Sequence, residues 1–226
     1  MNLEQNIRGL CDKFGIDYVG FLADIGVESV SELTISDLEI ICEEYETDLN
    51  ALLFNFPFKS NHLKSKLENI KLLVLDVDGV MTDGGMYFTE SGDQFKKYNT
   101  KDGMAIIHLT KNNFPVAIIS SGFKAEGVTR RAEMLGIQHC TVNREPKMDR
   151  LNSICKELSL ELENVAMIGD DINDLEVMKA IGFSACPKDA VNVIKSNADI
   201  ILNKKGGEGC VREFIELYML KEPLNK

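Results

Sequence analysis

The sequence predicts an α/β protein: a Rossmann-like, mostly parallel sheet with helices on both faces, preceded by a small all-α unit. From residue 71 onward, short apolar runs alternate with amphipathic stretches, which is the order expected of βαβ units. Polar residues directly follow three of these runs, and open α/β sheets bind their ligands at such strand ends. The first 60 residues instead show helical periodicity and an excess of acidic residues.

Four continuous apolar runs are the predicted strands. Each is too short for a helix and has the composition of a strand buried on both faces. The runs cover residues 72–75, 115–119, 165–168 and 200–202. Two other stretches have apolar residues at helical spacing, namely Leu151, Ile154, Cys155 and Leu158 in one, and Val211, Phe214, Ile215, Tyr218 and Met219 in the other. We expect these stretches to be helices that cover the sheet.

Residues 1–60 form the first predicted domain, which is helical, and residues 61–226 form the second. Helices are expected over 3–14 and 17–25. Ser36 and Glu39 have the spacing of a capping box that begins a third helix. The apolar face of that helix comprises Leu38, Ile41, Cys42 and Tyr45. A fourth helix, capped by Thr47 or Asp48, carries Leu49, Leu52 and Leu53 and is expected to end at Pro57.

The stretch 33–54 loosely resembles the helix-turn-helix units of small DNA-binding domains, but its charge argues against DNA binding. The chain has 25 Lys and Arg residues and 36 Asp and Glu residues, which gives a net charge of −11. From Phe14 to Phe58 there are ten acidic residues and no basic one, so nothing there can neutralise a phosphate backbone. Nucleic acid is therefore an unexpected partner, and packing or oligomerisation is the preferred role of this unit.

The sequence carries no sign of a membrane or export segment. No apolar run reaches the roughly 18 residues of a membrane-spanning helix, and the N-terminus lacks the charge and hydropathy order of a signal peptide. The six cysteines include no CxxC pair and lie mostly among apolar neighbours, as reduced core thiols do. We expect a cytoplasmic protein with no membrane partner.

Carboxylates gather at the ends of the predicted strands. Asp76 and Asp78 follow the first run, Asp170 and Asp171 follow the third, and Asp174 comes one helical turn later. Each residue alone is equally well explained as a turn former or helix cap. Together at one sheet edge, however, these carboxylates would raise each other's pKa values by repulsion. A hard cation removes this conflict, and Mg²⁺ prefers oxygen ligands combined with a substrate phosphate.

A phosphate group also needs hydrogen-bond donors and a cation beside these carboxylates. Ser121 and the amides around Gly122 follow the second run and can bind phosphoryl oxygens. Lys147 begins a predicted helix and can balance the negative charge that develops during phosphoryl transfer. Considered by itself, Lys147 is more simply interpreted as a solvated surface lysine. The whole set favours a small phosphorylated substrate.

Six segments of the second domain resemble those of one enzyme superfamily. The stretch DVDGVMTDG at 76–84 looks like the DxDG(V/L)xTDG opening of the haloacid dehalogenase superfamily. Within that superfamily, the 3-deoxy-D-manno-octulosonate 8-phosphate phosphatases are the most similar family. Ser121 and Gly122 resemble the second motif, Lys147 the third, and residues 169–171 with Asp174 the fourth. KDG at 101–103 and GGEGCVRE at 206–213 resemble two further segments of that family.

The resemblance implies a role for each matching residue. Asp76 would be the nucleophile that becomes an aspartyl-phosphate, and Asp78 would be the general acid and base. The ligands of Mg²⁺ would be Asp76, the backbone carbonyl of Asp78 and Asp170, with Asp171 or Asp174 orienting that shell or Lys147. Phosphate binding would fall to Ser121, Gly122 and Lys147, and substrate binding to Lys101, Asp102 and Gly103. The reaction would be hydrolysis of a sugar-acid phosphate.

The spacing of these motifs leaves no room for a large cap domain over the site. The stretches 86–89 and 94–98 flank the turn-forming run ESGD, which predicts a β-hairpin flap. The similar family closes its capless sites by forming tetramers, so a homo-oligomer is expected, with a tetramer favoured. The acidic front unit is a second candidate for subunit contact.

One position leaves the identity of the substrate undecided. Phe123 stands where the similar family usually has an arginine that helps to bind the sugar acid. Arg130 or Arg131, on the following predicted helix, could serve instead. Related 9-phosphates of nonulosonic acids form a second substrate class. Two alternatives of other kinds are a phosphotransferase or mutase on the same scaffold, and a regulator that senses a sugar phosphate and uses the helical front unit.

Overall fold

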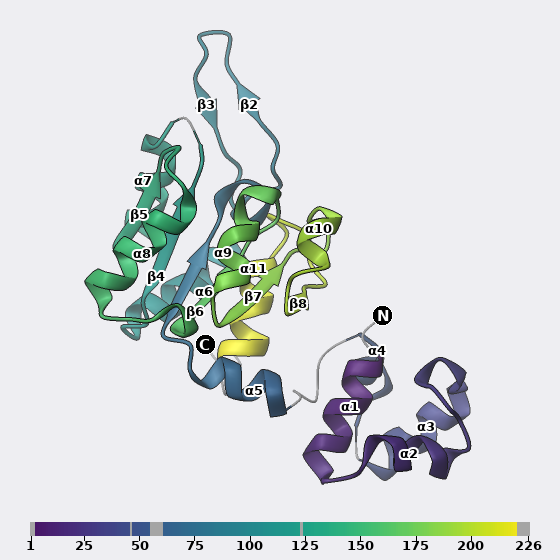
Figure 1. The fold of residues 1–226 in the computed structure, drawn as a ribbon. Helices are drawn as coiled ribbons and strands as arrows, with labels where there is room; N and C mark the ends of the chain where they lie inside the picture. Colours follow the sequence, from purple (N-terminus) through teal and green to yellow (C-terminus); the bar gives the residue numbers. More distant parts are fainter. Residues whose placement is uncertain (1–2, 46, 55–60, 123, 221–226) are drawn as a thin grey trace. The chain divides into compact units, whose positions relative to one another are not determined.

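The computed structural model describes residues 3–45, 47–54, 61–122 and 124–220, so Pro57 and Phe123 lie outside the described residues. It divides the chain into two compact units, Met1–Glu68 and Asn69–Lys226 (Figure 1). This division falls eight residues after the predicted boundary at 60/61. Within the described ranges, no helix is long and apolar enough to cross a membrane.

The first unit is built from short helices around a small apolar core. The helices are α1 (Leu3–Phe14), α2 (Tyr18–Ile25), α3 (Ile35–Glu44), α4 (Leu49–Phe54) and α5 (Asn61–Glu68). Leu38, Ile41 and Cys42 are buried as predicted, and they pack with Ile7, Leu10, Phe21, Leu22 and Leu52. Of the other predicted face residues, Leu52 is buried, whereas Tyr45, Leu49 and Leu53 are half-buried at the margin of the core.

The predicted capping box of α3 is wrong by two residues. Thr34, not Ser36, is the N-cap, and its hydroxyl accepts the backbone N–H of Asp37 at 3.2 Å. The Asp37 carboxylate in turn accepts the backbone N–H of Thr34 at 2.8 Å. Threonine with a carboxylate three residues later satisfies two amide donors in the same way as the predicted pair would, so α3 begins two residues earlier than predicted, at Ile35.

The second unit is a six-stranded sheet in which every neighbouring pair of strands is parallel, which confirms the predicted Rossmann-like fold. The strand order is β5-β4-β1-β6-β7-β8. The strands are β1 (Leu72–Leu75), β4 (Val116–Ser120), β5 (His139–Val142), β6 (Val165–Ile168), β7 (Phe183–Cys186) and β8 (Ile200–Ile201). Four of them match the predicted apolar runs, whereas β5 and β7 were not predicted. Because β1 lies between β4 and β6, the loops after these three strands meet at one edge.

Helices cover both faces of this sheet (Figure 1). The helices are α6 (Thr100–Lys111), α7 (Glu126–Met134), α8 (Lys147–Leu158), α9 (Leu175–Ala180), α10 (Asn192–Lys195) and α11 (Cys210–Phe214). On one face, Leu72 and Val74 pack against apolar side chains of α8, α9 and α10. On the other face α6 packs against α11, where the ring of Phe214 stacks on Tyr218 with centroids 5.7 Å apart. Alternate residues of β1 therefore enter two separate apolar layers.

A β-hairpin extends from the loop between β1 and α6, as predicted (Figure 1). Its strands, β2 (Tyr87–Phe88) and β3 (Gln94–Phe95), pair in antiparallel register, with Tyr87 opposite Phe95. The rings of these two residues stack with centroids 5.3 Å apart. Of the described residues between β1 and β4, only the hairpin, α6 and short connections are present, so no large cap domain is inserted there.

Candidate active site

The candidate site lies where β1, β4 and β6 end side by side. Asp76 directly follows β1, Ser120 ends β4, and Asp170 comes two residues after β6. The Asp76 N–H donates to the carbonyl of Ile168 at 3.2 Å, so the parallel pairing continues to the edge itself. The two acidic loops are therefore held at a fixed separation by the sheet.

Two glycines allow the loop after β1 to approach its neighbours closely. Gly79 has a φ of +85°, and a Cβ at this position would overlap the Asp170 carboxylate. Gly206, from the C-terminal GGEG segment, packs so closely on the Gly79 carbonyl that a Cβ there would also overlap. The neighbouring Gly207 N–H donates to the Val80 carbonyl at 2.9 Å. This explains physically why a glycine-rich segment far along the chain supports the Asp76 loop.

Lys147 lies at the centre of the carboxylate cluster. It is the first residue of α8, and its Nζ is 2.8 Å from Asp76 Oδ1 and 2.6 Å from Asp174 Oδ1. Only 3% of the Lys147 side chain is exposed, so the interpretation as a solvated surface lysine is wrong. Although burial lowers the pKa of this ammonium, the charges of Asp76 and Asp174 together raise it above its usual value. Lys147 therefore remains charged.

Asp174 and Asp171 have different surroundings. The buried Asp174 accepts the backbone N–H groups of Asp170 at 3.0 Å and Asp171 at 3.4 Å through Oδ2, while Oδ1 receives Lys147. Asp171 is exposed, and its side chain accepts the N–H of Ile172 at 2.7 Å. Of the two residues predicted to orient the metal shell or Lys147, the structure brings only Asp174 into contact with Lys147.

The carboxylate cluster has the properties of a cation site. One oxygen from each of Asp76, Asp170 and Asp174 lies within 4.8 Å of the other two. Burial and the charge of Asp174 raise the pKa of Asp76 to about 7. Burial and the charges of Asp76 and Asp174 raise the pKa of Asp170 to about 8. Asp170 Oδ1 is buried without a hydrogen-bond partner among the described residues. A divalent ion would satisfy this oxygen and relieve the repulsion, so these residues fit a metal.

A pocket of about 240 Å³ opens above the cluster. Asp76, Asp78, Asp170 and Asp171 supply its carboxylates, and the lining also includes Ser121 and Gly122, for which a phosphate-binding role was predicted. The remaining lining residues were not among the predicted site residues: Met86, Gln94, Lys96, Ser120 and Asn173. Lys96 is paired with Asp78. The predicted strand over 94–98 was the available signal for Lys96, because alternate residues of a strand share one face.

The predicted substrate-binding segment does not line this pocket. Lys101 is exposed, and a Cβ on Gly103 would overlap the Arg131 guanidinium. The buried Asp102 instead accepts the backbone N–H of Arg212 at 2.7 Å, which joins α6 to α11. Burial raises the pKa of Asp102 to about 6, although three backbone amides act in the opposite direction. Within this chain, the segment therefore has a packing role.

The two arginines suggested as substitutes at Phe123 are also outside the lining of the pocket. Arg130 is exposed on α7. The guanidinium carbon of Arg131 lies 5.5 Å from the centroid of the Tyr98 ring, a cation–π arrangement. Neither arginine is thus placed to contact a ligand in the pocket of the same chain.

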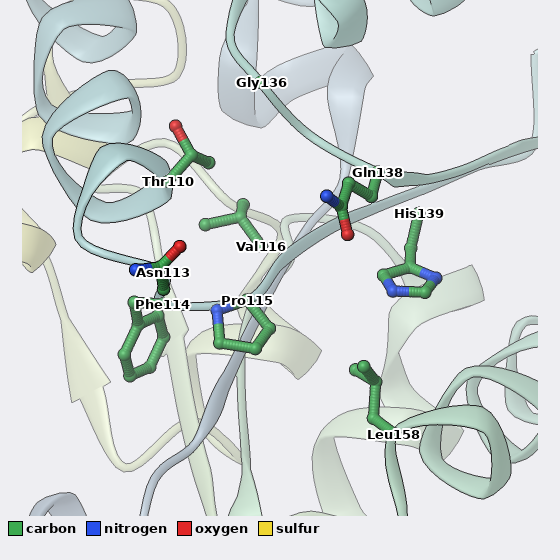
Figure 2. Close-up of a pocket in the computed structure, with 9 residues that line it drawn as sticks. All are labelled: Thr110, Asn113, Phe114, Pro115, Val116, Gly136, Gln138, His139 and Leu158. Carbon is green, nitrogen blue, oxygen red and sulfur yellow. The ribbon is translucent and has the colours of Figure 1, made fainter.

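A second pocket, of about 200 Å³, lies at the opposite edge of the sheet, where β4 and β5 begin (Figure 2). Its lining includes Thr110, Pro115, Gln138 and His139. None of the nine lining residues is Asp, Glu, Lys or Arg. This pocket lacks groups for binding a metal–phosphate pair, so we assign the chemistry to the Asp76 edge.

Comparisons with known proteins agree with this assignment. A family model for haloacid dehalogenase-like hydrolases matches residues 94–182. The 3-deoxy-D-manno-octulosonate 8-phosphate phosphatase KdsC of Salmonella typhi is 39% identical over 163 residues, which are 72% of this chain and 86% of that protein. A probable YrbI family phosphatase from Pseudomonas syringae is 42% identical, with a TM-score of 0.68 over 71% of this chain and 90% of that chain.

A third relative was crystallised with ligands. It is the 3-deoxy-D-manno-octulosonate 8-phosphate phosphatase from Moraxella catarrhalis, in complex with magnesium, phosphate and KDO. Its TM-score is 0.66 at 34% identity, and the match covers 70% of this chain and 91% of that chain.

A parallel sheet whose central strand ends in an Asp-x-Asp pair beside a buried lysine and a second acidic loop defines a haloacid dehalogenase-like hydrolase. Hydrolases of this class that act as phosphatases use a divalent metal ion. Within this class, the chain belongs to the 3-deoxy-D-manno-octulosonate 8-phosphate phosphatase family. It is a phosphoric monoester hydrolase.

Proposed function

We propose that this enzyme hydrolyses the phosphate ester of a sugar acid, 3-deoxy-D-manno-octulosonate 8-phosphate or a close analogue, through an aspartyl-phosphate on Asp76. The observation that carries the proposal is the buried contact of Asp76 and Asp174 with Lys147, beside an Asp170 oxygen that has no hydrogen-bond partner in the described part of the chain. The substrates named for the relatives support the sugar-acid class. The regulator alternative gains no support from relatives that are phosphatases.

The residues of this chain divide the reaction between them. Asp76 attacks phosphorus while Asp78 donates a proton to the bridging oxygen, so the sugar leaves as an alcohol. Asp78, now a carboxylate, then takes a proton from the water that attacks the phosphorylated Asp76. Inorganic phosphate leaves and Asp76 is restored. Ser121 and the amide of Gly122 bind phosphoryl oxygens, and the Lys147 ammonium balances their charge.

The proposed metal is Mg²⁺, held by Asp76, Asp170 and the backbone carbonyl of Asp78. When bound, it supplies electrostatic stabilisation to the phosphoryl group and to the crowded carboxylates. Asp174 positions Lys147 and the Asp170 loop through the hydrogen bonds described above. Asp171 stabilises the turn after β6, because its side chain accepts the backbone N–H of Ile172.

The proposal predicts a metal-dependent preference for sugar-acid phosphates. Phosphate release should be fastest from 3-deoxy-D-manno-octulosonate 8-phosphate or a nonulosonic acid 9-phosphate, with kcat/KM at least about 10-fold above that for glucose 6-phosphate. EDTA should stop all three reactions, and added Mg²⁺ should restore them. Equal rates on the neutral sugar phosphate would contradict the substrate class. A phosphorylated acceptor with little free phosphate would instead indicate a phosphotransferase.

A homo-oligomer, with a tetramer favoured, is also part of the proposal, because the hairpin carries exposed apolar side chains. Met86, Phe88 and Phe95 are 61%, 58% and 56% exposed, which is an unusual concentration for a free surface. We expect light scattering to give a mass above that of one chain, and Phe88→Glu with Phe95→Glu to lower it. Met134→Glu, at an exposed apolar residue on α7, is the control. A monomeric wild-type protein would contradict this proposal.

Two further proposals concern the front unit and the compartment. Residues 1–60 are proposed to serve packing or oligomerisation, because their acidic helical surface is unsuited to nucleic acid. A cytoplasmic location is supported by the six cysteines, all of which are free thiols in the structure. Cell fractionation would test the location, and comparison of the oligomer mass with and without residues 1–60 would test the role of the front unit.

A further inference from the structure

We propose that Lys96 is a positioning residue that connects the β2–β3 hairpin to Asp78 and makes proton donation to poor leaving groups possible. The inference rests on the proposed function of Asp78 as general acid. Lys96 follows β3 directly, and its Nζ pairs with Asp78 Oδ1. Only 9% of the Lys96 side chain is exposed, whereas 71% of the adjacent Lys97 side chain is exposed.

The position of Lys96 follows from strand alternation in the hairpin. Gln94, Lys96 and Tyr98 are half-buried, while Phe95 and Lys97 between them are exposed. Gln94 and Lys96 line the pocket, so this face of the returning strand closes one side of the site. Lys97 points away and lies 3.4 Å from Asp83. Two successive lysines are therefore directed to opposite faces, and only one reaches the chemistry.

Of the described residues that line the pocket, Lys96 is the only cation, and the same lining includes four aspartates. Fixing a lysine side chain in one conformation costs rotamer entropy, so its ordered burial requires a compensating partner. Asp78 is that partner. The ion pair uses Asp78 Oδ1 and leaves Oδ2 as the oxygen that can carry the transferred proton.

This arrangement assists the leaving-group step. The Asp78 Oδ2 proton moves to the bridging oxygen as the P–O bond to the sugar breaks and the Asp76–P bond forms. The negative charge left on Asp78 is then stabilised by the adjacent ammonium. An alkyl leaving group needs this proton, because a free alkoxide is a strong base. p-Nitrophenolate leaves readily without one, so its departure depends little on Asp78 being correctly oriented.

The leaving group therefore separates a positioning role from a structural one. For Lys96→Met, we expect kcat/KM for a sugar-acid phosphate to fall by about 10²-fold, the lower end of the range for general acid catalysis. For p-nitrophenyl phosphate we expect a fall of about 3-fold or less. Lys96→Arg keeps the charge and should recover most of the activity toward the sugar-acid phosphate. Lys97→Met removes the same charge from the outer face and should leave both rates unchanged.

Two outcomes would overturn the inference: equal losses on the two substrates, or no loss on the sugar-acid phosphate. Light scattering on each variant shows whether the hairpin substitutions alter assembly, and equal losses caused by disassembly also count against a positioning role. Failure of the proposed function itself has a different signature, namely phosphate release by Asp76→Asn. If Asp76→Asn is inactive and Lys96→Met loses the same activity on both substrates, the proposed function stands and the positioning role of Lys96 is rejected.

Discussion

Replacing Asp76 by Asn is expected to reduce phosphate release by at least about 10⁴-fold, as removal of a catalytic nucleophile does in other enzymes. Asparagine has nearly the same shape, so the buried position at the end of β1 is retained. Its amide oxygen can still accept from Lys147, but it is too weak a nucleophile to displace a sugar alcohol from phosphorus. The measurement is release of p-nitrophenol and of inorganic phosphate at saturating Mg²⁺.

A matched control separates loss of the nucleophile from loss of charge in the same unit. Asp149 is an exposed aspartate in the first turn of α8, and Asp149→Asn should retain wild-type rates. Acid quenching during turnover gives a second readout, because labelled phosphate should be trapped on the wild-type protein and absent from Asp76→Asn. Substantial turnover by Asp76→Asn with an intact fold would reject the aspartyl-phosphate.

The strands that the sequence predicted and those it missed differ in how they are buried. The four predicted strands include three that are central, and apart from Ser120 at the end of β4 their side chains are apolar, because helices cover both faces. β5 is an edge strand whose four residues are only half-buried and include His139 and Thr141. β7 is fully buried but contains Ser184, whose hydroxyl donates to the Asp199 carboxylate at 3.2 Å. Because Ser184 forms its hydrogen bond to a residue outside the strand, it can be buried in β7. It interrupts the continuous run of apolar residues on which the strand prediction depended.

Predicting the candidate site was easier where residues follow strands. Asp76, Ser121 and Asp170 were located because the carboxyl ends of parallel strands meet at one edge. Lys96 was missed because the hairpin that carries it is outside the six-stranded sheet, so the rule for strand ends does not place it. Lys96 is also 18 residues from Asp78 along the chain, and the irregular loop between them gives no sequence pattern that predicts their contact. The packing role of Asp102 was also hidden, since its partner, the N–H of Arg212, lies 110 residues away.

Replacing Lys147 by Met is expected to lower both stability and activity, because it removes the ammonium between two buried carboxylates. Breaking a buried ion pair from one side typically costs about 3–5 kcal/mol in the free energy of unfolding. Loss of the charge that balances the phosphoryl oxygens should also reduce kcat by at least about 10²-fold. Denaturant unfolding in EDTA measures the first effect without interference from a metal. Lys156→Met, at an exposed residue of the same helix, should change stability by about 0.5 kcal/mol or less.

The loss of stability should depend on pH in a definite direction. Burial and Asp174 raise the pKa of Asp76 in the folded protein to about 7, so the protonated form is favoured by folding and its contribution is lost as the pH rises through 7. Lys147 opposes this shift, and without it the pKa of Asp76 should rise further. Lys147→Met should therefore destabilise the metal-free protein more at pH 8 than at pH 6, where Asp76 and Asp170 can be neutral. A loss of equal size at both pH values would mean that Lys147 acts through packing of its carbon chain, and that its charge is not what holds the aspartates together.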